Sequence, residues 1–255
     1  MKYVVGIDEA GRGPLAGPVT VGAFGTTEKV AKLILKDFFD GKLRDSKKLS
    51  EKKREEIFAK LSLLKKEGSV SFEVAHSTPK MIDKKGISKA VQEAIKKSLS
   101  WQIQRYHPSK SRSRKALKCT DIFLLKNSSC SAQSASQGIS ESSRSGISKN
   151  CDPEIFSGSI SNSEIEIRLD GLLNAPPEFK NQKTITKGDE KDVFIACASI
   201  VAKVSRDRLM CKLAKKYPEY RFEIHKGYGT ALHQNLIKKL GPSIIHRRSF
   251  CKNVI

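Results

Sequence analysis

Acidic residues come shortly after three short apolar segments of this chain. Asp8 and Glu9 follow the run 3–7, Asp170 follows 165–169, and Asp189 comes two residues after segment 182–187. One such acid is commonly a turn residue, but three on one sheet are difficult to explain as turns alone. Catalytic residues gather at strand ends, and four carboxylates suit two divalent cations about 4 Å apart, which support phosphodiester hydrolysis. These residues therefore predict a metal-dependent nuclease site.

The adjacent acids Asp8 and Glu9 would repel each other at the end of an apolar strand. Burying two like charges is costly unless hydrogen bonds or a cation compensate, and a hard ion such as Mg²⁺ or Mn²⁺ accepts oxygen ligands. Successive side chains of a strand point to opposite faces. Both acids could therefore share an ion only if the backbone turns there, which the glycines that follow allow. A solvated turn is the alternative interpretation.

The tripeptide Gly11-Arg12-Gly13 follows the acid pair. Glycines let a backbone approach a ligand closely, and successive amide groups beside an arginine can bind an anion. Gly-Arg-Gly turns also occur without a ligand. Next to acids that hold metal, however, amides that hold phosphate are the complementary half of a phosphodiesterase site.

Two further segments offer contacts to a nucleic acid. Ser46, Lys47 and Lys48 belong to a polar loop that is either a solvated connection or a set of phosphate contacts. Tyr228 lies on the glycine-flanked loop 224–230, where its ring either anchors the loop or stacks on a sugar or base. Near the acids, both would contribute to substrate binding.

The chain is strongly basic. Its 255 residues include 48 Lys and Arg against 27 Asp and Glu, a formal charge of +21. Such a charge favours a polyanionic partner over a small neutral substrate. No apolar stretch approaches the ~20 residues of a membrane span, the start lacks a signal-peptide pattern, and the six cysteines include no C-x-x-C pair. We expect a monomeric, cytoplasmic protein with reduced thiols and no membrane partner.

The elements that must position these residues are mixed strands and helices. Short β-branched runs predict strands, and apolar residues at helical spacing predict helices. Two strands joined by a glycine-rich turn indicate an antiparallel start to one mixed sheet in an α/β domain. The expected strands are 3–7, 19–24, 69–75, 165–170 and 182–187, and the expected longer helices are 28–39, 51–66, 86–106, 192–216 and 231–240.

Composition changes between residues 107 and 163. A basic run, 110–115, leads into segment 127–163, which contains fourteen serines and almost no large apolar side chains. Such a segment buries too little surface to offset the entropy of ordering it. We therefore expect a flexible insertion over 107–163 within a catalytic domain formed by 1–106 and 164–255.

Six segments carry motifs in a recognisable order: GIDEAGRGP (6–14), DSKKL (45–49), DG (170–171), KGD (187–189), ASIVAKVSRD (198–207) and HKGYGT (225–230). Together they resemble ribonuclease HII. The resemblance implies a ribonuclease H-like fold with a mixed five-stranded sheet flanked by helices. It also implies Mn²⁺- or Mg²⁺-dependent hydrolysis of the RNA strand of RNA/DNA hybrids. Single ribonucleotides embedded in duplex DNA would be cut on their 5′ side, leaving 3′-hydroxyl and 5′-phosphate ends.

The same resemblance implies a role for each motif. The Gly11–Gly13 turn would read the ribose 2′-hydroxyl at the RNA–DNA junction, and Tyr228 would stack on the sugar of the next deoxynucleotide. The metal-binding catalytic acids would be Asp8, Glu9, Asp170 and Asp189. Segment 120–125 also looks like a strand that enters an acid site, but Lys126 follows it, so we assign the catalytic strand to 165–170.

Two other functions are compatible with parts of this pattern. Ribonuclease HIII shares the fold and the acids, but it typically carries lysine between the glycines and an added N-terminal domain. Arg12 and a catalytic strand that starts at residue 3 argue against it. A nucleic-acid-binding module without catalysis would keep the acids only as turn residues. The presence of all four acids argues against that alternative.

Overall fold

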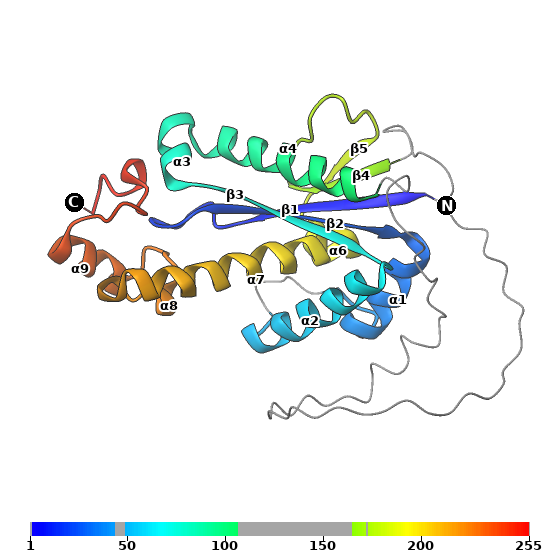
Figure 1. The fold of residues 1–255 in the computed structure, drawn as a ribbon, viewed down its shortest axis with the longest axis horizontal. Coiled ribbons are helices and arrows are strands. Elements are labelled where there is room, and N and C mark those ends of the chain that lie inside the picture. The colour runs from blue at the N-terminus through cyan, green and yellow to red at the C-terminus, as the bar shows by residue number, and fades with distance from the viewer. Residues whose placement is uncertain (1, 44–48, 107–164, 172, 255) are drawn as a thin grey trace, which may run out of the picture.

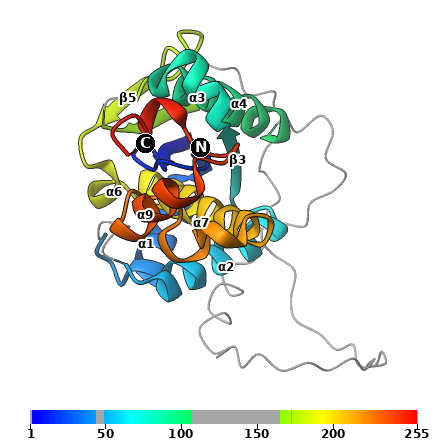
Figure 2. The same ribbon diagram turned by 90° about the vertical axis from the view of Figure 1, so that its left-hand side faces the viewer.

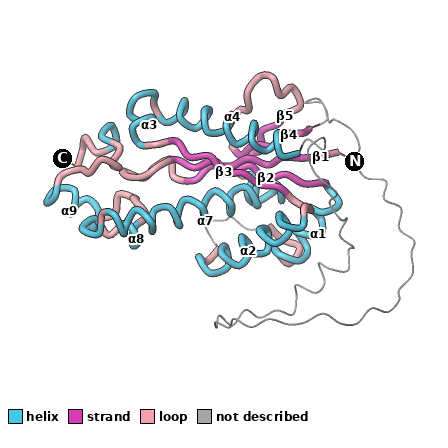
Figure 3. Tube along the Cα trace, in the orientation of Figure 1, coloured by secondary structure: helices cyan, strands magenta, loops and turns pink. Residues whose placement is uncertain are grey.

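The structure is a computed structural model that describes residues 2–43, 49–106, 165–171 and 173–254 (Figure 3). The expected Ser-rich insertion, 107–163, lies outside the described residues, and so do Ser46, Lys47 and Lys48. No helix within the described ranges is both long and apolar enough to cross a membrane.

A mixed five-stranded sheet forms the centre of the protein, as the sequence predicts. Its strands lie in the order β3-β2-β1-β4-β5. The β1–β2 and β2–β3 pairs are antiparallel, whereas β1–β4 and β4–β5 are parallel. The strands are β1 Tyr3–Ala10, β2 Val19–Thr27, β3 Ser71–Ser77, β4 Ile165–Asp170 and β5 Gln182–Ile185.

Helices cover both faces of the sheet (Figure 1). α3 and α4 lie on one face; α7 lies on the other, with α1 and α2 beside it. The C-terminal α8 and α9 lie at the end of the sheet toward which β1 runs (Figures 1 and 2). The helices are α1 Glu28–Phe39, α2 Glu51–Glu67, α3 Pro79–Lys85, α4 Ile87–Tyr106, α6 Gly188–Lys191, α7 Val193–Lys216, α8 Phe222–His225 and α9 Ala231–Leu240, with 3₁₀ turns at Pro218–Tyr220 and Arg248–Phe250.

Two apolar clusters, one on each face of the sheet, fix the orientation of β1. Val5 and Ile7 belong to the cluster that includes α4 residues, whereas Val4 belongs to the cluster that includes α7 residues. Because side chains alternate along a strand, Asp8 lies on the α7 face and Glu9 on the α4 face. The core therefore determines which way each acid points.

Two glycines let α7 lie directly against the sheet. A Cβ atom on Gly6 would come within 2.2 Å of the Phe194 backbone carbon, and one on Gly22 within 2.5 Å of the Ala198 carbonyl oxygen. Gly22 pairs with Asp8 across β1 and β2. The close approach of α7 therefore brings helix side chains onto Asp8.

β1 is longer than the sequence predicts. It continues through both acids to Ala10, with Asp8 opposite Gly22 and Glu9 opposite Val21 of β2. The backbone therefore does not turn at the acids, because β2 pairs with the strand past them, and the solvated-turn alternative does not hold. The backbone turns only at Gly11, whose φ is +87°.

β5 is shorter than the sequence predicts. It ends at Ile185 rather than at residue 187, because Lys187 adopts the left-handed conformation with φ of +55° and a helical turn, α6, follows at once. Asp189 therefore lies in the first turn of α6 and not at a strand end.

Candidate active site

Asp8 and Asp170 lie beside each other on the α7 face. β1 and β4 run parallel with Ile7 opposite Leu169, so the next residue on each strand is an aspartate. Leu169 shares the α4-side cluster with Ile7, and alternation therefore places both aspartates on the other face. Neighbouring strands are about 4.8 Å apart. The structure thus brings these two acids together from segments far apart in the sequence.

The surroundings of Asp8 disfavour its charged form. Burial raises the pKa of the Asp8 carboxyl well above its usual value, and the charges of Glu9 and Asp170 raise it further. Hydrogen bonds from the Ser199 hydroxyl and from the Glu9 N–H, at 2.7 Å, act in the opposite direction. Asp8 is 6% exposed, so water cannot relieve the repulsion. A cation in this position would stabilise the carboxylate.

Glu9 contributes an oxygen with an unused bonding capacity. Its Oε1 accepts a hydrogen bond from Arg12 Nη1 at 3.3 Å. Its Oε2 is buried and has no hydrogen-bond partner among the described residues. Leaving a buried acceptor unpaired costs about 1–3 kcal/mol, and more for a charged group. This atom is therefore poised to accept a donor or to contact a cation.

Asp189 is tied to the end of β4 through its neighbour. The Gly188 N–H donates to Asp170 Oδ1 at 2.6 Å, and α6 packs against β4 and α7. A Cβ on Gly188 would come within 2.5 Å of the Ile195 side chain, so this close approach requires glycine. Asp189 itself is 8% exposed. A third buried aspartate therefore lies one residue from a direct contact to Asp170.

The charge and burial of these acids fit a divalent cation. Asp8 and Asp170 repel each other, and Glu9 Oε2 is a buried oxygen without a partner. Within the described ranges, however, no three His, Cys, Asp or Glu side chains form a group arranged to hold a metal ion. The predicted assembly of all four acids around metal ions therefore stays a prediction.

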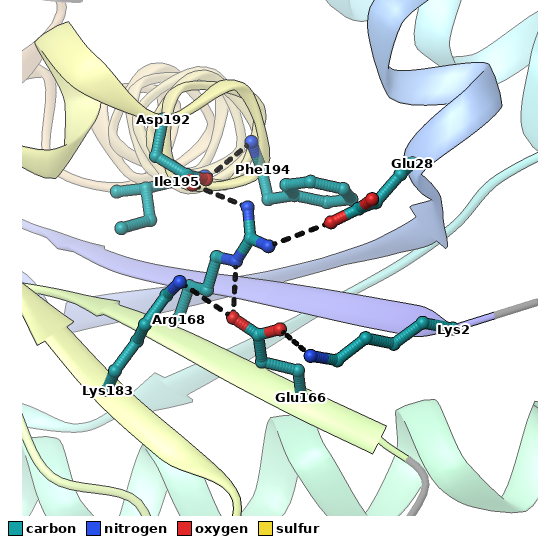
Figure 4. A network of polar contacts seen from close by, with 8 residues as sticks. All are labelled: Lys2, Glu28, Glu166, Arg168, Lys183, Asp192, Phe194 and Ile195. Atoms are coloured by element: carbon teal, nitrogen blue, oxygen red, sulfur yellow. Dashed lines mark hydrogen bonds and ion pairs between the residues drawn. The ribbon is translucent and has the colours of Figure 1, made fainter.

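A network of ion pairs fixes β4 against α7 (Figure 4). Arg168, two residues before Asp170, donates to Glu166 at 2.8 Å and to Asp192 at 2.9 Å. Asp192 also caps α7 by accepting the N–H groups of its first turn at 3.0 and 3.2 Å. Burial alone would raise the pKa of Glu166, but the donors Arg168, Lys2 and Lys183 outweigh it and hold that pKa far below its usual value. The network thereby orients the strand that carries Asp170.

Two buried arginines hold the loop 11–18, which contains the Gly-Arg-Gly turn. Arg247 donates to the carbonyls of Gly11 and Arg12, each at 2.7 Å, and to that of Gly17 at 2.9 Å. Arg206 donates to the carbonyls at positions 16 and 18. Burial, and then the charge of Arg206, lowers the pKa of Arg247 to about 9. The side chains of these arginines therefore bind five carbonyl groups of the loop in the absence of substrate.

Tyr228 reaches the same region from the C-terminal part of the chain. The residue is 40% exposed, and the Arg206 guanidinium carbon lies 5.5 Å from the centroid of the Tyr228 ring. On its other side, Arg206 packs under Gly11, where a Cβ would come within 2.0 Å of its Nε. Arg206 therefore joins Tyr228 to the Gly-Arg-Gly turn. Arg12 and Gly13 of that turn are exposed to solvent.

The sequence interpretation missed what Arg206 and Arg247 do. Arg206 is fully buried, although a basic residue between polar neighbours suggests a surface position. Its spacing from Ala202 and Met210, four residues on either side and both buried, was the available signal. For Arg247, nothing in the local sequence indicates burial.

We expect Asp8→Asn to stabilise the metal-free protein by about 1–2 kcal/mol, because it removes a buried charge that Glu9 and Asp170 repel. The measurement is urea unfolding in chelator at pH 8. Adding Mn²⁺ should stabilise the wild type more than the variant. The exposed Asp40→Asn is the matched control, since asparagine tolerates the left-handed backbone of that residue. A variant less stable than the wild type in chelator would contradict the repulsion.

The mixed five-stranded sheet with flanking helices is a ribonuclease H-like fold. Ribonuclease H2 from Pyrococcus horikoshii OT3 aligns over 99% of this chain and 96% of its own, with a TM-score of 0.56 and 22% identity. Bst-RNase HIII in complex with Mn²⁺ aligns over 99% of this chain and 69% of its own, with a TM-score of 0.59 and 15% identity. Both likenesses concern the fold.

The sequence comparisons are more specific. The family described as Ribonuclease HII matches residues 5–114 and 154–253. Ribonuclease HII of Caldicellulosiruptor bescii is 34% identical over 254 residues, which span 100% of this chain and 89% of that protein. The chain belongs to the ribonuclease HII family. It is accordingly a ribonuclease H endonuclease, and neither the ribonuclease HIII alternative nor the non-catalytic one holds.

Proposed function

We propose that this endonuclease hydrolyses the RNA strand of RNA/DNA hybrids and cuts on the 5′ side of single ribonucleotides embedded in duplex DNA. The products carry 3′-hydroxyl and 5′-phosphate ends. The observation that carries the proposal is the position of two repelling aspartates, Asp8 and Asp170, on neighbouring strands. The same strand, β1, leads directly into the arginine-held Gly-Arg-Gly turn.

Four carboxylates would hold Mn²⁺ or Mg²⁺ in this proposal: Asp8, Glu9, Asp170 and Asp189. Glu9 starts from the opposite face of β1, but it lies one residue before the end of that strand and its charge already acts on Asp8, so it would reach the ions around the strand end. Such ions supply an activated water and neutralise charge on the leaving oxygen. The unpaired Glu9 Oε2 and the raised pKa of Asp8 support a cation here. The chain's own contribution is to keep these carboxylates fixed, through the Gly188 N–H on Asp170 and the Ser199 hydroxyl on Asp8.

The Gly11–Gly13 turn would select for the ribonucleotide. A polar site shaped around the 2′-hydroxyl rejects DNA because its buried polar groups then stay unpaired. Arg247 already binds the carbonyls of Gly11 and Arg12, so the turn is organised before substrate binds. Tyr228, 40% exposed, would stack on the sugar of the following deoxynucleotide. Arg206 keeps this ring beside the turn.

The basic surface would supply affinity that does not depend on sequence. With a formal charge of +21, the protein should bind duplexes through phosphate contacts that weaken as salt rises. Ser46, Lys47 and Lys48 are proposed members of this surface.

A cleavage assay tests the proposal. The substrates are a DNA duplex with one embedded ribonucleotide, an RNA/DNA hybrid and an all-DNA duplex of the same sequence, each with Mn²⁺, Mg²⁺ or chelator. We expect cutting of the first two only, with either ion, and none in chelator. Mapping the ends should place the cut 5′ of the ribonucleotide. Cleavage of the all-DNA duplex, or cleavage in chelator, would contradict the proposal.

Arg12→Ala should reduce the preference for the ribonucleotide by about tenfold to a hundredfold, because it removes the exposed cation of the Gly-Arg-Gly turn and the partner of Glu9. The measurement is competition binding between the ribonucleotide-containing duplex and its all-DNA counterpart. Lys212→Ala removes an exposed charge from α7 and should weaken binding to both duplexes equally. Unchanged preference in the Arg12 variant would exclude the selective role of this side chain.

A further inference from the structure

Three buried histidines lie in the C-terminal part of the protein, and the chemistry proposed above does not use them. His225 ends α8, His233 lies in the first turns of α9, and His246 follows α9. Their exposed fractions are 6%, 0% and 2%. The Phe222 ring packs against all three. Because buried polar groups are nearly always hydrogen-bonded, each ring nitrogen of these histidines should have a partner.

The backbone fixes the proton of His246. The Ser243 N–H donates to His246 Nδ1 at 2.9 Å, so this nitrogen carries a lone pair. Burial lowers the pKa of both His246 and His233 to about 4, so the two rings are neutral at physiological pH. A neutral imidazole has one N–H. The proton of His246 is therefore on Nε2.

The proton position of His246 determines that of His233. The Nε2 atoms of His246 and His233 are 3.0 Å apart, so His246 donates and His233 accepts. The single proton of His233 must then be on Nδ1, which lies 2.9 Å from the Tyr228 carbonyl oxygen. The result is a one-way chain of hydrogen bonds from Ser243 through two imidazoles to Tyr228.

His225 packs beside this chain of hydrogen bonds. The Gly227 N–H donates to His225 Nδ1 at 3.2 Å, and His225 Nε2 then donates to the Tyr220 carbonyl at 2.8 Å. Its ring is stacked on that of His233, with centroids 4.1 Å apart. All three histidines therefore have defined tautomers, and each ring nitrogen has a partner.

This chain of hydrogen bonds ends at Tyr228, on the loop 224–230, which contacts the Gly-Arg-Gly region. The Tyr228 carbonyl also accepts the Thr230 N–H at 2.8 Å, and the preceding carbonyl, of Gly227, accepts the N–H groups of Leu15 and Ala16 at 2.8 and 3.2 Å. His246 itself forms a bridge to Ala16. The histidines therefore contact both loops that carry the proposed junction-reading residues, at Tyr228 and at Ala16.

We propose that His246 and His233 are positioning residues that orient Tyr228 for the ribonucleotide junction through this directed chain of hydrogen bonds. The inference rests on the proposed function, in which the Tyr228 ring meets the sugar. Neither histidine touches the substrate or the acids. Their contribution is to hold the Tyr228 backbone, and so the direction of its ring, before the duplex binds.

Two substitutions at one position separate this role from simple packing. His233→Asn places an amide N–H where Nδ1 was and keeps the donor to Tyr228. His233→Gln reaches the Nε2 position instead and loses that donor. On the duplex with one ribonucleotide, kcat/KM of the Gln variant should be about tenfold below that of the Asn variant, mainly through KM. Equal values for the two variants would overturn the proposal.

A second comparison keeps the test decisive if a His233 variant does not fold, as urea unfolding would reveal. His246→Gln retains a donor at the Nε2 position, whereas His246→Asn does not, so the Gln variant should keep the higher kcat/KM. In a Tyr228→Ala background each pair of variants should become equal, because the orienting effect acts through the ring. Differences that persist in this background would contradict action through Tyr228.

The tautomers give a readout that does not require activity. Imidazole ¹⁵N NMR of the wild type at pH 7 should show His246 protonated on Nε2 and His233 on Nδ1. A proton on Nε2 of His233 would contradict the proposed direction of the hydrogen bonds, whatever the cleavage activity of the enzyme. Conversely, the wild type could show these tautomers and still leave the ribonucleotide-containing duplex intact. That result would contradict the proposed function but not the directed chain of hydrogen bonds.

Discussion

Asp170→Asn is expected to abolish cleavage, lowering kcat by on the order of 10³-fold or more, while affinity for the uncut duplex stays unchanged. The asparagine oxygen can still accept the Gly188 N–H, so the end of β4 and α6 should keep their places. The lost charge removes one carboxylate that would hold the cations beside Asp8. Single-turnover cleavage gives the rate, and fluorescence anisotropy in chelator gives the affinity.

The control for this variant is Asp40→Asn, which removes an exposed carboxylate at the end of α1. It should cleave at the wild-type rate. Wild-type cleavage by Asp170→Asn would refute the assignment of the acid to the site. Loss of duplex binding in the same variant would show instead that Asp170 supports the fold of the binding surface.

Arg247→Met should destabilise the protein by about 3 kcal/mol, because three backbone carbonyls of loop 11–18 lose their hydrogen-bond donors. Each buried carbonyl left without a donor costs about 1–3 kcal/mol. Those carbonyls belong to Gly11, Arg12 and Gly17. Relief of the repulsion from Arg206 offsets part of the loss. Urea unfolding at constant m-value measures the change.

The adjacent Arg248→Met provides the comparison, since Arg248 is exposed and its loss should change the free energy of unfolding by less than about 0.5 kcal/mol. Preference for the ribonucleotide should also fall in Arg247→Met, because the Gly-Arg-Gly turn loses its anchor. If the two variants were equally stable, the buried guanidinium would not be what holds the turn.

The architecture could be predicted from the sequence because its signals are local. Alternating apolar residues and the glycine-rich connection predict β1 and β2 as an antiparallel pair, and the cap on α2 follows from Ser50, whose hydroxyl accepts the Lys53 N–H at 3.2 Å. Where a strand ends depends on its partner. β2 remains paired with β1 beyond Asp8 and Glu9, and the local sequence does not indicate that this pairing continues.

The site could be predicted only in part, for a related reason. The apolar runs place Asp8 and Asp170 at the ends of two strands of one sheet, but only the structure shows that these strands are parallel neighbours with matched ends. The roles of Arg206, Arg247 and His246 depend on backbone carbonyls and N–H groups contributed by distant segments. Side chains that bind main-chain atoms leave no complementary residue type in the sequence, so their burial becomes visible only in three dimensions.

The ion-pair network around Arg168 has a consequence for how the enzyme responds to salt. Its inner members Glu166, Arg168 and Asp192 have side-chain exposures of 6%, 14% and 10%, and buried pairs are screened far less than exposed charges beyond a Debye length of about 8 Å. Concentrated electrolyte should thus detach the protein from a polyanion while the scaffold beneath Asp170 stays intact. Dilution alone should then restore full turnover, without any refolding step.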